Sequence, residues 1–172
     1  MKKLKILFFA WVSLLPMLGY PFGGAADTEW PRWATVEVQL NLSATLGPGG
    51  QVKVSGDLLI KNPSDAALII QSPRNRLALA FLAFDPLGNP VVPIVCGKAD
   101  PGFDTRTLSP RATYTQHFES LDFVTGGALL SYDLRPGKKY RVVAVYRPAG
   151  ANGPGFTSQE TKLEIPQTEK RE

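Results

Sequence analysis

Apolar and polar residues alternate strictly from position 36 to position 43, which is the pattern of a strand with one buried face. A second alternating run covers 52–60, and Gly56 interrupts it in the middle, as a β-bulge would. The Gly-Pro-Gly-Gly segment at 47–50 separates the two runs and is typical of a turn. The two runs and the turn therefore predict a β-hairpin.

The middle of the chain holds a run, 77–84, that is apolar on both faces, as in a central strand covered from both sides. Its Leu and Ala content would also permit a helix. We favour a strand because the run is short and a turn sequence, 85–89, follows it directly. The next apolar run, 91–96, predicts an edge strand, since Pro90 and Pro93 cannot donate hydrogen bonds to a sheet.

Residues 113–118 and 140–146 also alternate as strands do. The stretch 123–130 has a weak pattern with two glycines, which we interpret as a crossover with one helical turn. Further strands are expected at 67–70 and 156–165, and loops at 97–107 and 148–155. About seven or eight short strands and no convincing amphipathic helix predict an all-β fold, an immunoglobulin-like antiparallel β-sandwich.

The first residues have the three-part layout of a secretory signal peptide: three lysines, an apolar run at 6–18, and small residues at 23–26. The apolar run is shorter than the roughly 20 residues that a bilayer span needs. We therefore expect cleavage after Ala25 or Ala26 and an exported protein, periplasmic or extracellular, with no membrane span after cleavage. The expected organisation is a signal peptide at 1–26, a linker at 27–34, the sandwich domain at 35–166 and a polar tail at 167–172.

Charge says little in favour of a nucleic-acid or membrane partner. The chain has 19 basic and 15 acidic residues, a net charge of +4, but three lysines and no acids lie in 1–26. The remainder has 16 basic residues against 15 acidic ones, so its net charge is 16 − 15 = +1. A nearly neutral chain does not favour binding to phosphates or to an anionic membrane surface.

One stretch carries a family resemblance. Leu134 is followed by Pro136 and Gly137 in a turn, and Tyr140 then opens a Val-rich strand. This spacing resembles the corner between the sheets of bacterial immunoglobulin-like and fibronectin-type-III-like domains. The resemblance implies that the hydroxyl of Tyr140 bonds back to the backbone and fixes the crossing between two sheets. Val142 stands where antibody domains have their second cysteine, so the antibody type is not implied.

Two other segments, 58–63 and 84–91, add to this resemblance through a strand that ends in Asn-Pro and a strand followed by Asp, Gly and Val. The chain also resembles, more weakly, the bacterial proteinase inhibitors with a sandwich fold, which share Asp-x-x-Gly hairpins and Leu-x-Pro turns. Fold resemblance does not establish function.

No catalytic, cofactor or metal site is expected. His117 is the single histidine, and its strand pattern points it outward, without a nucleophile motif beside it. Cys96 is the single cysteine of the sequence, so no intrachain disulfide can form. We expect it to be a buried small hydrophobe rather than an exposed thiol. Glu119 and Asp122 are expected to be solvated carboxylates rather than an acid–base pair.

Three residues could bind a partner protein. Trp30 and Trp33, with an arginine between them, have the composition of an interface hot spot, although they could equally pack over an open end of the sandwich. Arg147 precedes the long loop at 148–155, where such sandwiches present binding loops, although this loop could be a plain connector.

The functional hypothesis is an exported, non-catalytic β-sandwich that acts by protein–protein contact or as a structural accessory of the bacterial cell envelope. Its partner would be another protein, bound at the edge strand 91–95 or at the loops at the sandwich ends. A proteinase-inhibitor-like module that inserts a loop into a protease cleft is the alternative hypothesis. An enzyme is the third, and no titratable cluster in the sequence favours it.

Overall fold

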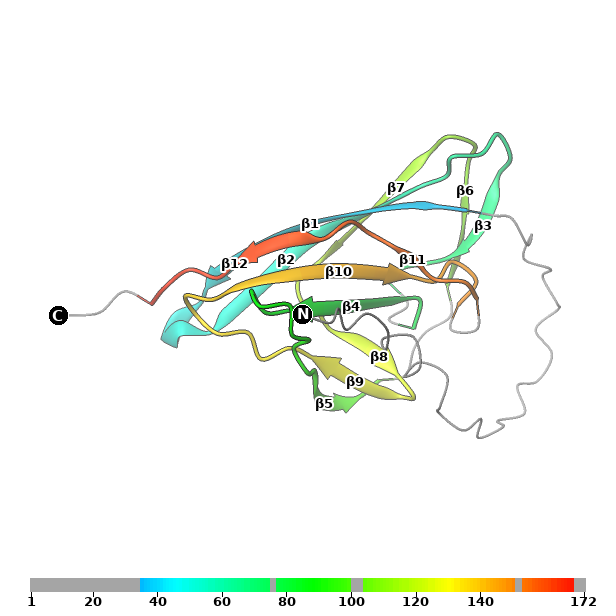
Figure 1. Ribbon diagram of the computed structural model, residues 1–172. Helices are drawn as coiled ribbons and strands as arrows, with labels where there is room; N and C mark the ends of the chain where they lie inside the picture. The colour runs from blue at the N-terminus through cyan, green and yellow to red at the C-terminus, as the bar shows by residue number, and fades with distance from the viewer. Residues whose placement is uncertain (1–34, 75–76, 100–103, 151–152, 169–172) are drawn as a thin grey trace, which may run out of the picture. The chain divides into compact units, whose positions relative to one another are not determined.

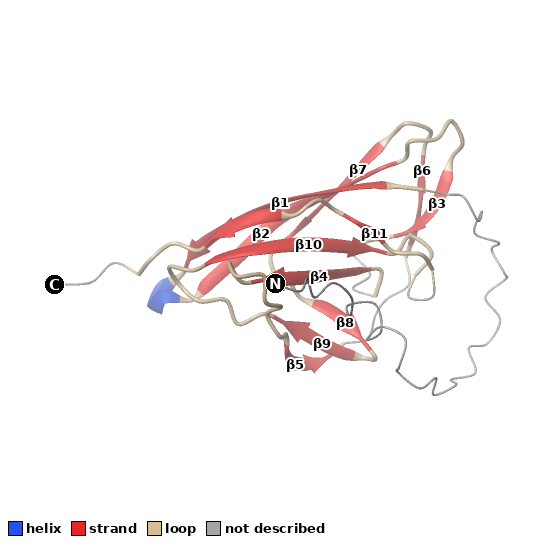
Figure 2. Cartoon of the chain, viewed as in Figure 1, coloured by secondary structure: helices blue, strands red, loops and turns tan. Residues whose placement is uncertain are grey.

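The computed structural model describes residues 35–74, 77–99, 104–150 and 153–168. The chain divides into two units, Met1–Trp30 and Pro31–Glu172, and all described residues belong to the second (Figure 1). The expected signal peptide and linker, and most of the expected tail, lie outside the described residues. The described part contains twelve strands, one 3-10 turn and no α-helix (Figure 2). The predicted all-β sandwich is confirmed, with more and shorter strands than the seven or eight expected.

The first sheet contains β1 (Glu37–Leu46), β2 (Val52–Lys61) and β7 (Thr113–Phe118), in the order β1-β2-β7. β1 and β2 form the predicted hairpin and pair antiparallel over their whole length. The short 3-10 turn η1 (Pro48–Gly50) joins them, and Gly49 and Gly50 have positive φ angles of 76° and 79° there.

The bulge predicted at Gly56 is wrong, because the pairing of β1 with β2 runs through this residue without a shift, from Leu42 to Gly56. Glycine is needed at position 56 because neighbouring atoms occupy the space that a side chain would fill. A Cβ at this position would lie 2.1 Å from the carbonyl oxygen of Asn41 and 3.0 Å from the ring of Phe118. Glycine in a strand interior often marks such an approach of neighbouring groups.

The second sheet is built on β10 (Lys139–Tyr146). β4 (Leu79–Phe84) pairs with one edge of β10, and β11 (Phe156–Thr157) and β12 (Thr161–Glu164) share its other edge. The strand predicted at 156–165 is therefore two strands. Between them Ser158 remains bound to β10, since its N–H donates to Ala144 O (2.9 Å) and its hydroxyl accepts from Ala144 N–H (3.0 Å).

The core lies between these two sheets and is filled by alternate side chains of their strands, as in a sandwich. Phe118 on β7 contacts Phe81 on β4, with ring centroids 5.1 Å apart. The buried apolar side chains of the two sheets include Val38, Leu40, Leu58, Ile60, Phe81, Ala83, Val142, Ala144, Tyr146 and Leu163.

A third, smaller sheet has the order β5-β9-β8, from β5 (Ile94–Lys98), β9 (Ala128–Ser131) and β8 (Phe123–Thr125). The crossover with a helical turn predicted at 123–130 is wrong, because β8 and β9 form a tight hairpin. Its two central residues, Gly126 and Gly127, have φ angles of 56° and 78°. Two positive φ angles match the twist of a two-residue hairpin, which explains the two glycines.

The fourth sheet pairs β3 (Leu68–Gln71) with β6 (Thr105–Leu108), so a strand lies at the end of the segment predicted to be a loop at 97–107. Asn62, which is fully buried, ties the nearby chain segments together. Its side-chain amide donates to Ala66 O (2.7 Å) and Ser109 O (3.1 Å). Buried polar groups need such partners, so this asparagine holds the ends of β2, β3 and β6 in place.

Candidate protein-binding surface

The corner residues connect the third sheet to the second. Between β9 and β10, the backbone N–H of Arg135 donates a hydrogen bond to the hydroxyl oxygen of Tyr140 (3.1 Å), while Leu134 is buried. Gly137 has a φ of 71°, and its N–H donates to Pro166 O (2.9 Å). The side chain of Tyr140 thus bonds back to the backbone of the chain that precedes it, and this bond fixes where β10 begins.

Of the three residues expected to bind a partner, the structure describes only Arg147. Trp30 and Trp33 lie outside the described residues. Arg147 is half-buried, and its backbone N–H donates to Ala78 O (2.7 Å). The next residue, Pro148, is fully buried, and its carbonyl accepts from Gln71 N–H (2.7 Å). The start of the loop at 148–155 therefore packs against the sandwich rather than projecting from it.

Exposed apolar side chains gather on one segment. Six large apolar residues of the described chain are strongly exposed, and five of them lie between positions 82 and 95. We call these five the apolar edge: Leu82 (46% exposed), Leu87 (87%), Val92 (77%), Ile94 (52%) and Val95 (70%). Single exposed apolar residues are normal on a protein surface, but a concentration of them marks an interaction site.

The segment that follows Pro90 lies beside β4. An antiparallel bridge joins Phe84 and Pro90, and Val91 N–H donates to Ala83 O (2.8 Å), so the segment after Pro90 runs along β4. Leu82 on β4 and Val92 in this segment are both exposed. Two residues further on, the chain enters β5. The strand predicted at 77–84 is present as β4, but the prediction that it is covered on both faces is wrong, because Leu82 on its outer face is half exposed.

β5 is an edge strand, as predicted, although it begins later than expected, at Ile94. In Figure 1 it is the outermost strand of its sheet, with β9 on one side. In the described ranges nothing pairs with its other side. Ile94 and Val95 are consecutive, so their side chains point to opposite faces of the sheet, and both are exposed. The strand therefore offers free backbone groups with apolar side chains on either face.

The outer face of the first sheet is different. Along β1 the exposed side chains are Glu37, Gln39, Asn41, Ser43 and Thr45, all of them polar. An ion pair between Glu37 and Lys61 (2.9 Å) joins β1 to β2 on this face. The apolar edge is thus a local feature of the molecule, not a property of its whole surface.

The prediction of a buried Cys96 is wrong, because the residue is exposed. It lies at an irregularity of β5, where the pairing with β9 shifts between Val95 and Gly97. Its Sγ lies 3.4 Å from Leu129 O, within the range of a weak hydrogen bond. An edge strand of a small sheet has too little cover to bury a side chain at this position, and the sequence did not show that.

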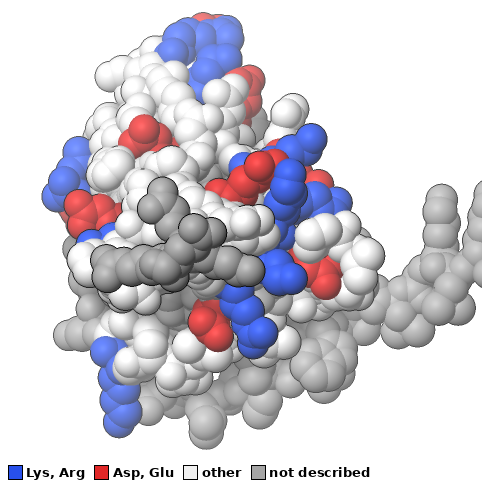
Figure 3. All heavy atoms as spheres, turned by 90° about the vertical axis from the view of Figure 1, so that its left-hand side faces the viewer, with Lys and Arg blue, Asp and Glu red and all other residues white. Residues whose placement is uncertain are grey.

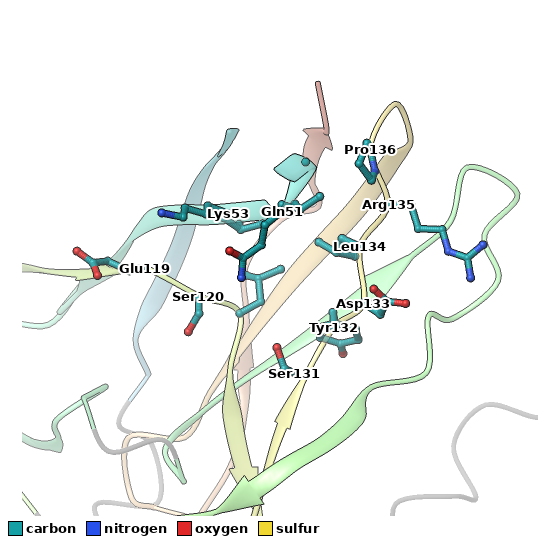
Figure 4. Close-up of a pocket in the computed structure, with 14 residues that line it drawn as sticks. Gln51, Lys53, Glu119, Ser120, Ser131, Tyr132, Asp133, Leu134, Arg135 and Pro136 are labelled. Atoms are coloured by element: carbon teal, nitrogen blue, oxygen red, sulfur yellow. The ribbon is translucent and has the colours of Figure 1, made fainter. Parts of the chain in front are cut away.

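A hollow of about 510 Å³ lies at the end of the sandwich beside the corner (Figure 4). Val54, Leu121 and Leu134 are its buried apolar residues. Its polar side chains come from the start of β2, the connection of β7 to β8, and the corner segment. They are Gln51, Lys53, Glu119, Ser120, Ser131, Asp133 and Arg135, and none of these side chains has a hydrogen bond or ion pair within the described part of the chain. The sequence carried no signal for this hollow.

Charges of both signs surround this end of the molecule. Figure 3 faces the end that carries η1, and blue and red side chains alternate over its visible surface. Mixed charge does not form the one-signed field that attracts phosphates, which agrees with the net charge of the sequence. In Figure 4 the side chain of Arg135 points away from the hollow, while the amide of Gln51 extends toward Ser120.

His117 points outward from β7, as its strand pattern predicted, and its side chain is 62% exposed. Its Nδ1 lies 3.0 Å from Oδ1 of Asp57 on the neighbouring strand.

Among the described residues, no three His, Cys, Asp or Glu side chains lie close enough together to hold a metal ion. Nor does the described part contain a helix long and apolar enough to cross a membrane.

The phenol groups of two tyrosines have a pKa raised well above the ordinary value. Burial raises the pKa of Tyr132 to about 12, and its hydroxyl donates to Phe81 O (2.6 Å). Burial, with a smaller contribution from nearby Tyr114, raises the pKa of Tyr146, whose hydroxyl donates to Gln71 O. Both phenols donate to backbone carbonyls of the fold, so their role is structural.

Comparison with known proteins shows no relative, because no protein-family model and no curated protein matches this chain.

Proposed function

We propose that this chain is an exported, non-catalytic β-sandwich of immunoglobulin-like type that acts by binding another protein, as an accessory of the bacterial cell envelope. The apolar edge is the observation that carries the proposal, since it holds five of the six strongly exposed large apolar side chains among the described residues. Burying such side chains against a partner is worth roughly 25 cal/mol per Å² of apolar surface. The corner at Tyr140 supports the immunoglobulin-like type.

The mode of binding that fits this edge is addition of a strand. A partner strand laid beside β5 would pair with backbone groups that have no other partner among the described residues. Backbone pairing supplies affinity in such complexes, and the side chains on the two faces supply specificity. On β5 those side chains are Ile94 and Val95, so the partner strand should be apolar.

The test is capture of partners by the immobilised full chain from envelope extract, with matched variants. Val95→Lys places a charge on the apolar edge. Ile69→Lys is the control, because it places the same charge at an apolar residue of β3 that is 57% exposed and does not belong to the apolar edge. We expect the wild-type chain and Ile69→Lys to capture the same protein, and Val95→Lys to lose it. Equal capture by all three chains would refute the proposal that the apolar edge is the binding surface.

A second candidate function, protease inhibition, is favoured by the turn at Leu87. This side chain is 87% exposed at the tip of a turn that Asp85 holds rigid. Oδ1 of Asp85 accepts from the N–H groups of Leu87 (2.9 Å) and Asn89 (2.8 Å). A rigid loop with one exposed apolar side chain can enter a protease cleft at little entropic cost. Stoichiometric inhibition of a leucine-cleaving serine protease, abolished in Leu87→Asp, would favour this function over the first.

A further inference from the structure

We propose that the hollow beside the corner binds a small neutral ligand rich in hydroxyl groups, a short oligosaccharide. None of the five residues of the apolar edge lines this hollow, so the inference goes beyond the proposed function and does not rest on it. Its volume of about 510 Å³ lies within the range of about 300–1,000 Å³ that is usual for small-molecule sites.

The acidic side chains without a partner gather at this end of the molecule. Six of the ten acidic side chains in the described ranges are paired with a Lys, Arg or His side chain, and a seventh, Asp85, accepts hydrogen bonds within its turn. The three without a partner there are Glu119, Asp122 and Asp133. Glu119 and Asp133 line the hollow. Most described carboxylates are thus bound within the fold, whereas those of the hollow are open to a ligand.

The walls of the hollow are held from beneath. Each of its three segments has a buried apolar residue beside its polar ones: Val54 on β2, Leu121 between β7 and β8, and Leu134 at the corner. The hydrogen bond from Arg135 N–H to the hydroxyl oxygen of Tyr140 fixes the corner backbone as well. A site whose backbone is already ordered loses less conformational entropy when a ligand binds.

The middle of the hollow is uncharged. Figure 4 shows the amide of Gln51 extending toward Ser120, with Ser131 below them in this view. These three side chains have no partner among the described residues. An amide group and a hydroxyl group each offer both donors and acceptors, and so do the hydroxyl groups of a sugar. The middle of the hollow therefore matches the hydrogen-bonding groups of such a ligand.

The charges at the sides of the hollow balance. In Figure 4 Lys53 and Glu119 lie on one side, and Asp133 and Arg135 lie on the other, so each side has one positive and one negative group. Attraction of an anion such as phosphate needs a field of one sign, and a zwitterion needs opposite signs at its two ends. Neither arrangement is present. A neutral ligand fits, because its hydroxyl groups can donate to the carboxylates of Glu119 and Asp133.

The experiment follows the backbone amide chemical shifts of the isotopically labelled full chain while a probe is added. The neutral probes are maltose, cellobiose and diacetylchitobiose, and the charged probes are inorganic phosphate and glycylglycine. Each is added to about 10 mM, which detects a Kd of about 1 mM. We expect at least one neutral probe to shift the amide signals of 50–54, 119–121 and 131–136, and the charged probes to leave these signals in place.

Matched variants test the groups in the middle of the hollow. The double variant Gln51→Ala, Ser120→Ala removes two of them, so the Kd of the sugar should rise at least about tenfold. Gln39→Ala is the control, because it removes the same amide from the exposed face of β1, which does not line the hollow. This variant should bind as the wild-type chain does. Melting curves of both variants establish that they are folded.

An absence of shifts with every neutral probe, or shifts confined to other parts of the chain, would overturn the inference. Binding of phosphate or glycylglycine in place of the sugars would overturn it too, as would a double variant that binds the sugar as tightly as the wild-type chain. The proposed function is tested separately, since capture of an envelope protein through Val95 can succeed where sugar binding fails, and the reverse.

Discussion

The backbone N–H of Arg135 and the phenolic oxygen of Tyr140 are joined by a hydrogen bond of 3.1 Å that closes the connection between β9 and β10. The two partners are five positions apart in the sequence, so the bond holds a short loop that crosses from the third sheet to the second. Leu134 packs into the core on one side of it, and the turn at Gly137 follows on the other.

Replacement of this phenol should weaken the fold without changing its shape. Tyr140→Phe keeps the ring in place but leaves the N–H of Arg135 without its acceptor, and we expect a loss of about 1 kcal/mol in the free energy of unfolding. Urea denaturation measures it. Tyr114→Phe is the control, because within the described part of the chain the hydroxyl of Tyr114 bonds only to Gln116, on its own strand. An equal loss in both variants would contradict a special role for the corner.

Gly56 should tolerate no side chain. In Gly56→Ala the new methyl group would overlap the carbonyl oxygen of Asn41 and force β1 and β2 apart, so we expect a loss of about 3 kcal/mol or more. The matched control is Gly97→Ala, since nothing lies within 4 Å of a Cβ there and a change within about 0.5 kcal/mol is expected. Urea denaturation of the three chains at one protein concentration compares them. Similar midpoints for both variants would show that the sheet can yield at Gly56.

The turn at Asp85 should give the fold an acid-sensitive contribution. Hydrogen bonds from the Asn89 side chain and from backbone N–H groups hold the pKa of the Asp85 carboxyl below its usual value of 3.8. Because the folded pKa is the lower one, the stabilisation is present above about pH 4 and is lost as the pH falls through the folded value. The melting temperature of the wild-type chain should exceed that of Asp85→Asn at pH 6. The difference should disappear toward pH 2, and a constant difference would contradict the assignment.

Tyr132 should make the stability of the fold sensitive to alkaline pH. Burial raises its pKa to about 12, above the value of about 10 in an unfolded chain. The stabilisation is therefore complete below about pH 10 and is lost as the pH rises from about 10 to 12. The absorbance at 295 nm follows phenolate formation, and the difference between the wild-type chain and Tyr132→Phe isolates this residue. If that difference titrates near pH 10 while circular dichroism still shows a folded chain, Tyr132 is not buried as described.

Local pattern was sufficient where a strand has one buried and one solvated face. The alternation at 36–43 and at 140–146 predicts β1 and β10, because every second residue there is turned toward the core, such as Val38 and Leu40 on β1 and Val142 and Ala144 on β10. The same reasoning placed His117 outward. It was insufficient for 123–130, where two glycines permit either a loop or a tight hairpin. Only the pairing of β8 with β9 selects the hairpin.

The candidate binding surface was predictable in part. Pro90 and Pro93 indicate an edge strand, and β5 is one. Cys96 was expected to be buried because free cysteines usually are, but burial depends on what covers a strand, and that is a property of the whole fold. For the same reason the exposure of Leu82, on a run that is apolar on both faces, could not be predicted.

The sequence by itself determined the all-β class, the first hairpin and the turn residues, since these follow from side-chain alternation and from the conformations that glycine and proline favour. The tertiary structure decided which strands are neighbours, why position 56 must be glycine, and which apolar side chains stay in contact with water. Those properties depend on contacts between residues far apart in the chain, and no local pattern specifies such contacts.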